Sequence, residues 1–285
     1  MSLKSILRNW VIQAISIPRN SVNIEISQLN YGGILKDEKI IVTGGSKGIG
    51  LAIAEKLINE GAEIIITGRN ENDLKEAVNK LGKQSHYELF DSSNVDGIED
   101  FINNCRKKLG GIDSLVLNAG VSFHEGTFLN VTKDGFQSQF DINLKSNYFF
   151  IQTFVKKKLE QNETGNVLVI SSETGGKSND LPYGLTKNAL NSFVEGVARR
   201  VYQRGIRINA VAPGVTYTNM TRGNHIITDD YSNNSAAGRY LLPSEIAETA
   251  CFLLSKCSSC ITGEILYCDA GSHLKINGFD QDYIL

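Results

Sequence analysis

The 285-residue sequence lacks an excess of either charge, because its 29 basic and 31 acidic residues leave a formal net charge of −2. This balance offers no electrostatic attraction for nucleic acid or for an anionic membrane. The sequence also lacks an apolar run of about 20 residues, the length that a helix needs to span a bilayer. Its hydrophobic share of 41% and charged share of 21% are those of an ordinary globular protein.

Cysteine is scarce, and the five cysteines form no even-numbered disulfide framework. We therefore expect a reducing, cytoplasmic location. Cys257 and Cys260 form a C-x-x-C pair, but only Cys268 and His273 follow it, and the ligand spacing of a zinc site is missing. The pair follows the end of a predicted helix, whereas reactive pairs gain their reactivity from a helix N-terminus. We expect neither a bound metal nor a redox role.

From residue 39 onwards the sequence alternates between short apolar segments and amphipathic segments. The apolar segments predict strands at Lys39–Thr43, Glu63–Thr67, Ser85–Phe90, Ser114–Leu117, Asn166–Ser171, Ile206–Val211 and Glu264–Cys268. The amphipathic segments predict helices that include Gly48–Glu60, Glu71–Leu81, Val95–Leu109, Pro182–Arg204 and Pro243–Ser255. Such alternation is typical of parallel strands with right-handed crossovers. We predict an α/β fold, a Rossmann-type doubly wound sheet of about seven parallel strands with helices on both faces.

Two segments stand outside this alternation. Residues 1–37 form an N-terminal extension with apolar residues at helical spacing, which predicts a partly helical segment. The alternatives for this segment are packing on its own domain or on a neighbouring subunit, partial disorder, and a helix on a membrane surface. Gln13 interrupts the apolar part and argues against a secretory signal. Residues 38–285 are predicted to form one domain, in which the polar stretch at about 216–242 leaves a strand end and is expected to be a substrate lid.

The turn after the first predicted strand, TGGSKGIG at residues 43–50, is rich in glycine. Gly44 permits a sharp exit from the strand, Gly48 lets backbone approach a pyrophosphate, and Gly50 lets the next helix pack closely on the sheet. The N–H groups at the start of that helix would face the phosphates. Between a strand and a helix, this turn indicates a dinucleotide site, with a purely structural turn as the alternative.

The end of the second predicted strand, AEIIITGRN, bears on the choice of dinucleotide. An NAD site usually has an acid there for the ribose 2′-hydroxyl, whereas this chain has Gly68 and Arg69. Lys47 adds a second cation from the glycine-rich turn. Because the guanidinium group of an arginine can donate several hydrogen bonds to a 2′-phosphate, we predict NADP(H) as the cofactor. The alternative is that both cations are solvated surface charges.

The stretch PYGLTK at residues 182–187 places Tyr183 four residues before Lys187, on one face of a predicted helix. Chance also produces such pairs, so the interpretation depends on the rest of the chain.

From about residue 38 to residue 272 the chain resembles the short-chain dehydrogenase/reductase family. The matching segments are TGGSKGIG, Asp91 in LFDSS, NAG at Asn118–Gly120, Asn143 in INLKS, Ser172 in ISSETG, YGLTK, PGVTYT at Pro213–Thr218, and ITGEILYCDAG.

The resemblance implies a catalytic tetrad and a cofactor site in residues 38–285. The tetrad would be Asn143, Ser172, Tyr183 and Lys187. The cofactor-binding residues would be Gly44, Ser46, Lys47, Gly48, Ile49, Gly50, Arg69, Asp91, Asn118, Ala119, Gly120, Tyr183, Lys187, Pro213, Gly214, Val215 and Thr218.

The family chemistry gives each member of the tetrad a role. Lys187 is expected to lower the pKa of Tyr183, which would then exchange a proton with the substrate oxygen near neutral pH. Lys187 would also hold the nicotinamide ribose. Ser172 would donate a hydrogen bond to the substrate carbonyl, and Asn143 would anchor a water chain leading to Lys187. Two alternatives remain open: Asn143 as a brace of its helix, and Ser171 in place of Ser172.

Several motifs are most like those of the 3-oxoacyl-[acyl-carrier-protein] reductases, including PGVTYTNMT, AAGR and PSEIAE. That branch reads an acidic carrier protein through basic residues. Arg204 matches one such position, but Glu163 occupies the other and argues against the carrier. The stretch from Ser172 to Tyr183 is also shorter than is usual in the family.

We therefore predict a reversible NADPH-dependent reductase that converts a ketone to a secondary alcohol. A 3-oxoacyl-[acyl-carrier-protein] substrate is favoured slightly over a free ketone, sugar or steroid. A non-catalytic NADP(H)-binding sensor or scaffold is the alternative from another class. The family is usually tetrameric or dimeric, which implies a homotetramer or homodimer here.

Overall fold

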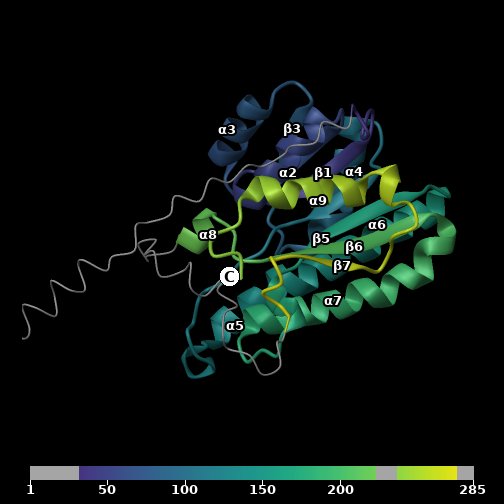
Figure 1. The fold of residues 1–285 in the computed structure, drawn as a ribbon. Coiled ribbons are helices and arrows are strands. Elements are labelled where there is room, and N and C mark those ends of the chain that lie inside the picture. The colour runs from purple at the N-terminus through teal and green to yellow at the C-terminus, as the bar shows by residue number, and fades with distance from the viewer. Residues whose placement is uncertain (1–31, 223–235, 275–285) are drawn as a thin grey trace, which may run out of the picture.

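The computed structural model describes residues 32–222 and 236–274, and a single parallel sheet runs through them (Figure 1). Its seven strands lie in the order β3-β2-β1-β4-β5-β6-β7. They are β1 (Lys39–Thr43), β2 (Glu63–Gly68), β3 (Ser85–Leu89), β4 (Ser114–Leu117), β5 (Gly165–Ile170), β6 (Ile206–Pro213) and β7 (Ile265–Cys268). The strand order reverses between β1 and β4, which is the place where ligands bind in doubly wound sheets. The predicted fold class is confirmed.

Helices cover both faces of the sheet. They are α2 (Gly48–Asn59), α3 (Glu71–Leu81), α4 (Ile98–Leu109), α5 (Lys133–Gln139), α6 (Ser146–Gln161), α7 (Pro182–Val201), α8 (Asn219–Arg222) and α9 (Pro243–Leu254). Helices α2, α3 and α9 pack on one face, and α4, α6 and α7 pack on the other. Figure 1 shows α9 lying alongside α2 and α7 running past β6 and β7.

The period-2 alternation of strand side chains explains why the inner strands are apolar throughout. Ile40 and Val42 of β1 face the layer of α2 and α9, whereas Ile41 between them faces the layer of α4 and α7. All three side chains are fully buried. A strand covered on both sides has no solvent face on which to place polar residues.

The boundaries of the predicted elements agree with the observed ones to within about two residues, except where short turns adjoin a helix. The predicted helix from Val95 begins with the separate 3₁₀ turn η1 (Val95–Gly97), which is capped by Asn94, whose side chain accepts a bond from Gly97 N. The segment between α5 and α6 is a π-helix, η3 (Phe140–Lys145), which the sequence pattern did not predict. Segments of this kind are rare and occur frequently at functional sites.

The domain includes residues before β1. Leu35 is 1% exposed, and its N–H donates to Glu60 O at 3.1 Å. The N–H of Asp37 donates to Gly61 O at 3.1 Å, and that of Gly33 to the Glu60 carboxylate at 3.1 Å. Residues 33–37 are thus bound to the end of α2.

The prediction of a partly helical extension concerns mainly residues 1–31, which lie outside the described part of the chain. Within that part, no helix combines the length and the apolar character needed to cross a membrane.

We expect Leu35→Ala to lower the free energy of unfolding by about 2–5 kcal/mol, because it removes a buried side chain and leaves a cavity. Chemical denaturation monitored by circular dichroism measures the change. Lys36→Ala, at an exposed neighbouring position, should change stability by less than about 0.5 kcal/mol. Equal midpoints for Leu35→Ala and the unaltered protein would show that residues 33–37 do not contribute to the fold.

Candidate active site

The glycine-rich turn after β1 has a backbone that depends on glycine. Gly44 has a φ of 62° and Gly48 a φ of 56°, in the left-handed region that other residues rarely adopt. A Cβ placed on Gly50 would overlap the carbonyl oxygen of Gly44 and the side-chain amide of Asn118. The turn therefore presents bare backbone at the carboxyl end of β1.

The first turn of α2 is suited to an anion. Its N-cap residue Lys47 makes no side-chain capping bond, and the first turn contains no acidic residue. The leading N–H groups of the helix and its positive dipole end are left for a ligand. Together with the glycine surface, this donor set fits the pyrophosphate of a dinucleotide, so residues 44–50 would hold it.

The ends of neighbouring strands support this turn. The side-chain amide of Asn118, just after β4, donates to Thr43 O at 3.1 Å and to Gly44 O at 2.9 Å. Ala119 N donates to the Thr43 hydroxyl at 3.1 Å. Thr218 approaches from beyond β6, and its methyl group would lie 3.2 Å from a Cβ on Gly48. The predicted segments NAG and PGVTYT are thus brought to the cofactor turn.

The end of β2 carries a mixed charge pattern. Arg69 is exposed, as the prediction of a 2′-phosphate site requires. Lys47, however, forms an ion pair of 2.7 Å with Asp73 in the first turn of α3. Asp91, after β3, is exposed, and its Oδ1 accepts bonds of 2.9 Å from the N–H and the hydroxyl of Ser93. Asp73 was not among the predicted residues, because its carboxylate comes from the following helix rather than from the strand end.

Tyr183 and Lys187 lie in the first turns of α7, which begins at Pro182. The Lys187 Nζ lies over the Tyr183 ring, 5.6 Å from its centroid, and donates to Ile170 O at 2.8 Å. Ile170 is the last residue of β5, so this bond brings the pair to the strand end from which Ser172 follows. The helix and the strand end together produce a compact group of polar side chains.

The structure corrects one electrostatic expectation. Burial raises the pKa of Tyr183, and the adjacent Ser172 hydroxyl acts in the opposite direction. Burial also lowers the pKa of Lys187 to about 8. The prediction that Lys187 lowers the pKa of Tyr183 is therefore wrong for this structure. The ammonium group is bound to a backbone carbonyl, and both side chains lose hydration of their charged forms.

Asn143 lies in the π-helical segment η3 and is fully buried. Its side chain donates to Val121 O at 2.9 Å and accepts from Val121 N at 2.8 Å. A Cβ on Gly120 would lie 3.2 Å from Asn143 Oδ1 and 3.8 Å from Lys187 Nζ, so both side chains lie close to Gly120. This geometry accommodates both readings of Asn143, a brace of the chain after β4 and a neighbour of the catalytic pair.

The two serines after β5 face different surroundings. Ser171 Oγ donates to Asn191 Oδ1 of α7 at 2.5 Å. Ser172 Oγ instead accepts bonds from Thr174 N at 3.3 Å and from the Thr174 hydroxyl at 3.0 Å, and it lies beside Tyr183. The surroundings therefore favour Ser172 over Ser171 as the serine of the site.

The flanks of the predicted lid are joined to each other. Leu241 N donates to Val215 O at 3.0 Å, and Tyr217 N donates to Leu241 O at 2.8 Å. Thr216 and Leu241 form an isolated parallel bridge. Residues 223–235, the middle of this stretch, lie outside the described part of the chain, and the lid assignment remains a prediction.

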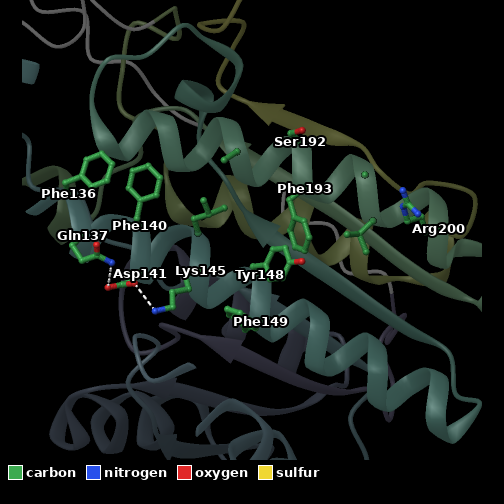
Figure 2. A pocket seen from close by; sticks show the side chains of 14 residues that line it. Phe136, Gln137, Phe140, Asp141, Lys145, Tyr148, Phe149, Ser192, Phe193 and Arg200 are labelled. Atoms are coloured by element: carbon green, nitrogen blue, oxygen red, sulfur yellow. Dashed lines mark hydrogen bonds and ion pairs between the residues drawn. The ribbon is translucent and has the colours of Figure 1, made fainter. Parts of the chain in front are cut away.

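A large open groove of about 750 Å³ lies elsewhere, between α5, η3, α6 and α7. Figure 2 shows Phe136 and Phe140 at one end, Tyr148 and Phe193 near the middle, and Arg200 at the other end. None of the predicted catalytic or cofactor-binding residues lines it. Its exposed aromatic side chains mark a different kind of surface from the polar site at the strand ends.

Comparison with known proteins agrees with this architecture. A family profile described as enoyl-(acyl carrier protein) reductase matches residues 44–273, most of the chain. The chain therefore belongs to the short-chain dehydrogenase/reductase family, whose members are oxidoreductases that use NAD(P)(H).

Its relatives act on different substrates. The 3-oxoacyl-[acyl-carrier-protein] reductase FabG of Salmonella typhimurium is 33% identical over 240 residues, 82% of this chain and 96% of the relative. The L-rhamnose 1-dehydrogenase (NADP(+)) of Thermoplasma acidophilum is 31% identical over 252 residues, 83% of this chain and 96% of the relative. A putative gluconate dehydrogenase structure from Agrobacterium tumefaciens superposes with a TM-score of 0.78 at 27% identity, covering 85% of this chain and 98% of its own.

The pKa of Lys187 leads to a testable pH dependence. A lysine with a lowered pKa is protonated below about pH 8 and neutral above it. If it resupplies the proton during carbonyl reduction, kcat/KM should fall as the pH rises through about 8. Lys187→Arg, which keeps its charge, should be less active but show no such fall. A flat profile for the unaltered protein between about pH 7 and pH 9.5 would contradict the assignment.

Proposed function

We propose that the protein is a reversible NADPH-dependent reductase that converts a ketone to a secondary alcohol. The favoured substrate is a 3-oxoacyl group on an acyl carrier protein. The observation that carries the reaction type is the grouping of Ser172, Tyr183 and Lys187 where β5 ends and α7 begins.

The side chains divide the chemistry among them. When bound, NADPH supplies the hydride, and residues 44–50, Asn118–Gly120 and Pro213–Thr218 would hold it. The Ser172 hydroxyl accepts two bonds from Thr174 and lies beside the Tyr183 hydroxyl. When substrate is bound, its proton would pass from the phenol oxygen to a bond with the substrate carbonyl. The Tyr183 phenol, kept neutral by its raised pKa, donates the proton to the developing alkoxide. Lys187 titrates near pH 8 and can replace that proton.

The preference for NADPH rests on the charges around the end of β2. Arg69 is exposed directly after β2, which ends in Gly68 without an acid. The ion pair between Lys47 and Asp73 partly balances the second cation. Arg69 is therefore the principal determinant in this proposal, and Lys47 would exchange Asp73 for the phosphate.

The acyl carrier assignment is supported by similarity to FabG and by the surroundings of Glu163. Glu163 accepts bonds of 3.0 Å from both Arg106 and Lys158, and the Arg106 guanidinium holds its pKa at about 2. The carboxylate is thus neutralised locally, which weakens the argument that it repels an acidic carrier. Arg204, at the end of η5 (Tyr202–Arg204), is exposed. The similarity to an L-rhamnose dehydrogenase keeps a free sugar or ketone as the second candidate.

A homotetramer or homodimer is proposed on the groove between α5, α6 and α7. Tyr148 and Phe149 of α6 are 41% and 36% exposed there, and Phe193 of α7 stacks on Tyr148 with ring centroids 4.4 Å apart. Exposed aromatic clusters of this kind are typical of protein interfaces.

A cytoplasmic location is proposed because all five cysteines are free thiols, namely Cys105, Cys251, Cys257, Cys260 and Cys268.

The substrate is tested by following NADPH oxidation with acetoacetyl thioesters, including the acyl carrier form, and with a panel of free ketones and sugars. Tyr183→Phe should lower kcat by about 100-fold or more, because it removes the proton donor, while NADPH binding is retained. Turnover of free ketones or sugars alone would remove the acyl carrier assignment. Full NADPH binding without turnover of any carbonyl compound would instead indicate a sensor or scaffold.

Cofactor choice has its own test. We expect Arg69→Ala to raise the KM for NADPH roughly 10-fold or more, since a charge-assisted hydrogen bond contributes about 1.5–3 kcal/mol. The KM for NADH should change little. Lys75→Ala, a cation on α3 paired with Glu71, is the matched control and should leave both values unchanged. Parallel losses for the two cofactors in Arg69→Ala would rule out a contact with the 2′-phosphate.

A further inference from the structure

The short loop between Ser172 and Tyr183 is held by two asparagine side chains. The Nδ2 of Asn179 lies 2.7 Å from Thr174 O and 2.6 Å from Lys177 O. The Nδ2 of Asn188 lies 2.6 Å from Gly175 O and 3.1 Å from Lys177 O. Asn188 Oδ1 lies 2.8 Å from the same Asn179 Nδ2, whose two hydrogens are shared among the three acceptors, and this contact joins the two amides into one unit. We call this pair the amide clamp.

Two of the three carbonyls that the clamp binds, Thr174 O and Gly175 O, belong to a turn next to Ser172, and the third, Lys177 O, lies on the residue after that turn. The 3₁₀ turn η4 (Glu173–Gly176) follows Ser172 directly, and Ser172 is its N-cap residue. Thr174, within the turn, donates both its N–H and its hydroxyl to Ser172 Oγ. Thr174, together with the adjacent Tyr183 hydroxyl, therefore orients the Ser172 hydroxyl, and the clamp holds Thr174 through its carbonyl.

The clamp is also attached to the helix that carries the other catalytic side chains. Asn188 directly follows Lys187 in α7. Asn179 packs against Gly184, the residue after Tyr183, so closely that a Cβ on Gly184 would overlap its Oδ1. The amide clamp thus connects the turn of Ser172 to the helix of Tyr183 and Lys187, and no metal or disulfide is needed to hold the short loop.

We propose that Asn179 and Asn188 are positioning residues, which aim the Ser172 hydroxyl at the substrate carbonyl by holding the η4 turn. The proposal rests on the proposed function, because it takes Ser172 as the hydrogen-bond donor in carbonyl reduction. Neither asparagine is required to touch the substrate. They affect the reaction only through the position of the Ser172 hydroxyl. A small displacement of a catalytic group is sufficient to reduce a rate by up to about 100-fold.

The test compares Asn179→Ala, Asn188→Ala and the double variant with the unaltered protein. We expect kcat to fall roughly 10- to 100-fold in each single variant, with the dissociation constant for NADPH changed less than about twofold. The double variant should lose no more than about twofold beyond the worse single variant, because the two amides act as one unit. Gly184→Ala should reproduce the loss, since the added methyl group displaces Asn179 while favouring the helix.

Asn166→Ala is the matched control. The Asn166 amide is buried and donates to two backbone carbonyls, Leu253 O at 3.0 Å and Leu254 O at 3.1 Å, near the opposite end of β5. Its removal should lower the thermal midpoint but leave kcat unchanged at temperatures well below that midpoint. This control separates a loss of stability from a loss of position.

Backbone amide hydrogen exchange of residues 173–178 provides a readout that does not depend on turnover. Exchange should accelerate at least about 10-fold in both clamp variants and remain unchanged in Asn166→Ala. Unchanged exchange, or an unchanged kcat in active protein, would overturn the proposal. Faster exchange in a protein that turns over no carbonyl compound would refute the positioning role together with the proposed function, while leaving the clamp itself as a structural feature.

Discussion

The hydrogen bond from the Lys187 ammonium group to the carbonyl of Ile170 is the contact on which the proposed catalytic end of the molecule depends. A buried cation requires a hydrogen-bond acceptor, and this one lies on the last residue of β5. The bond joins α7 to the strand end, and Ser172 follows two residues later. Tyr183, one helical turn before the lysine, is then placed against that serine. Burial keeps the phenol neutral and lowers the pKa of the lysine toward neutrality.

The two ends of the site are built by different means. The cofactor end uses bare backbone, in which Gly44 and Gly48 adopt left-handed conformations and the Asn118 amide bonds the turn. The catalytic end uses side chains, whose amides and hydroxyls hold a loop with little regular structure. Backbone geometry can be shared by many proteins that bind the same pyrophosphate.

Substrate choice is a property of these surroundings and not of the fold. Relatives of comparable identity include a 3-oxoacyl reductase and a sugar dehydrogenase, as expected where one scaffold serves many reactions. Glu163 illustrates how context changes the meaning of a residue. In sequence it is an acid at a position expected to be basic, whereas in the structure Arg106 and Lys158 surround it and lower its pKa.

The sequence by itself determined the strand–helix order, the glycine turn and the tyrosine–lysine pair, because each depends on local periodicity or on short spacing. The π-helical turn at Asn143 and the ion pair of Lys47 with Asp73 came only from the tertiary structure. So did the pKa directions of Tyr183 and Lys187, since burial depends on packing from several elements. No local sequence pattern reveals the amide clamp. Asn179 and Asn188 become partners only after the loop folds back on α7, which brings both side chains to the carbonyl of Lys177.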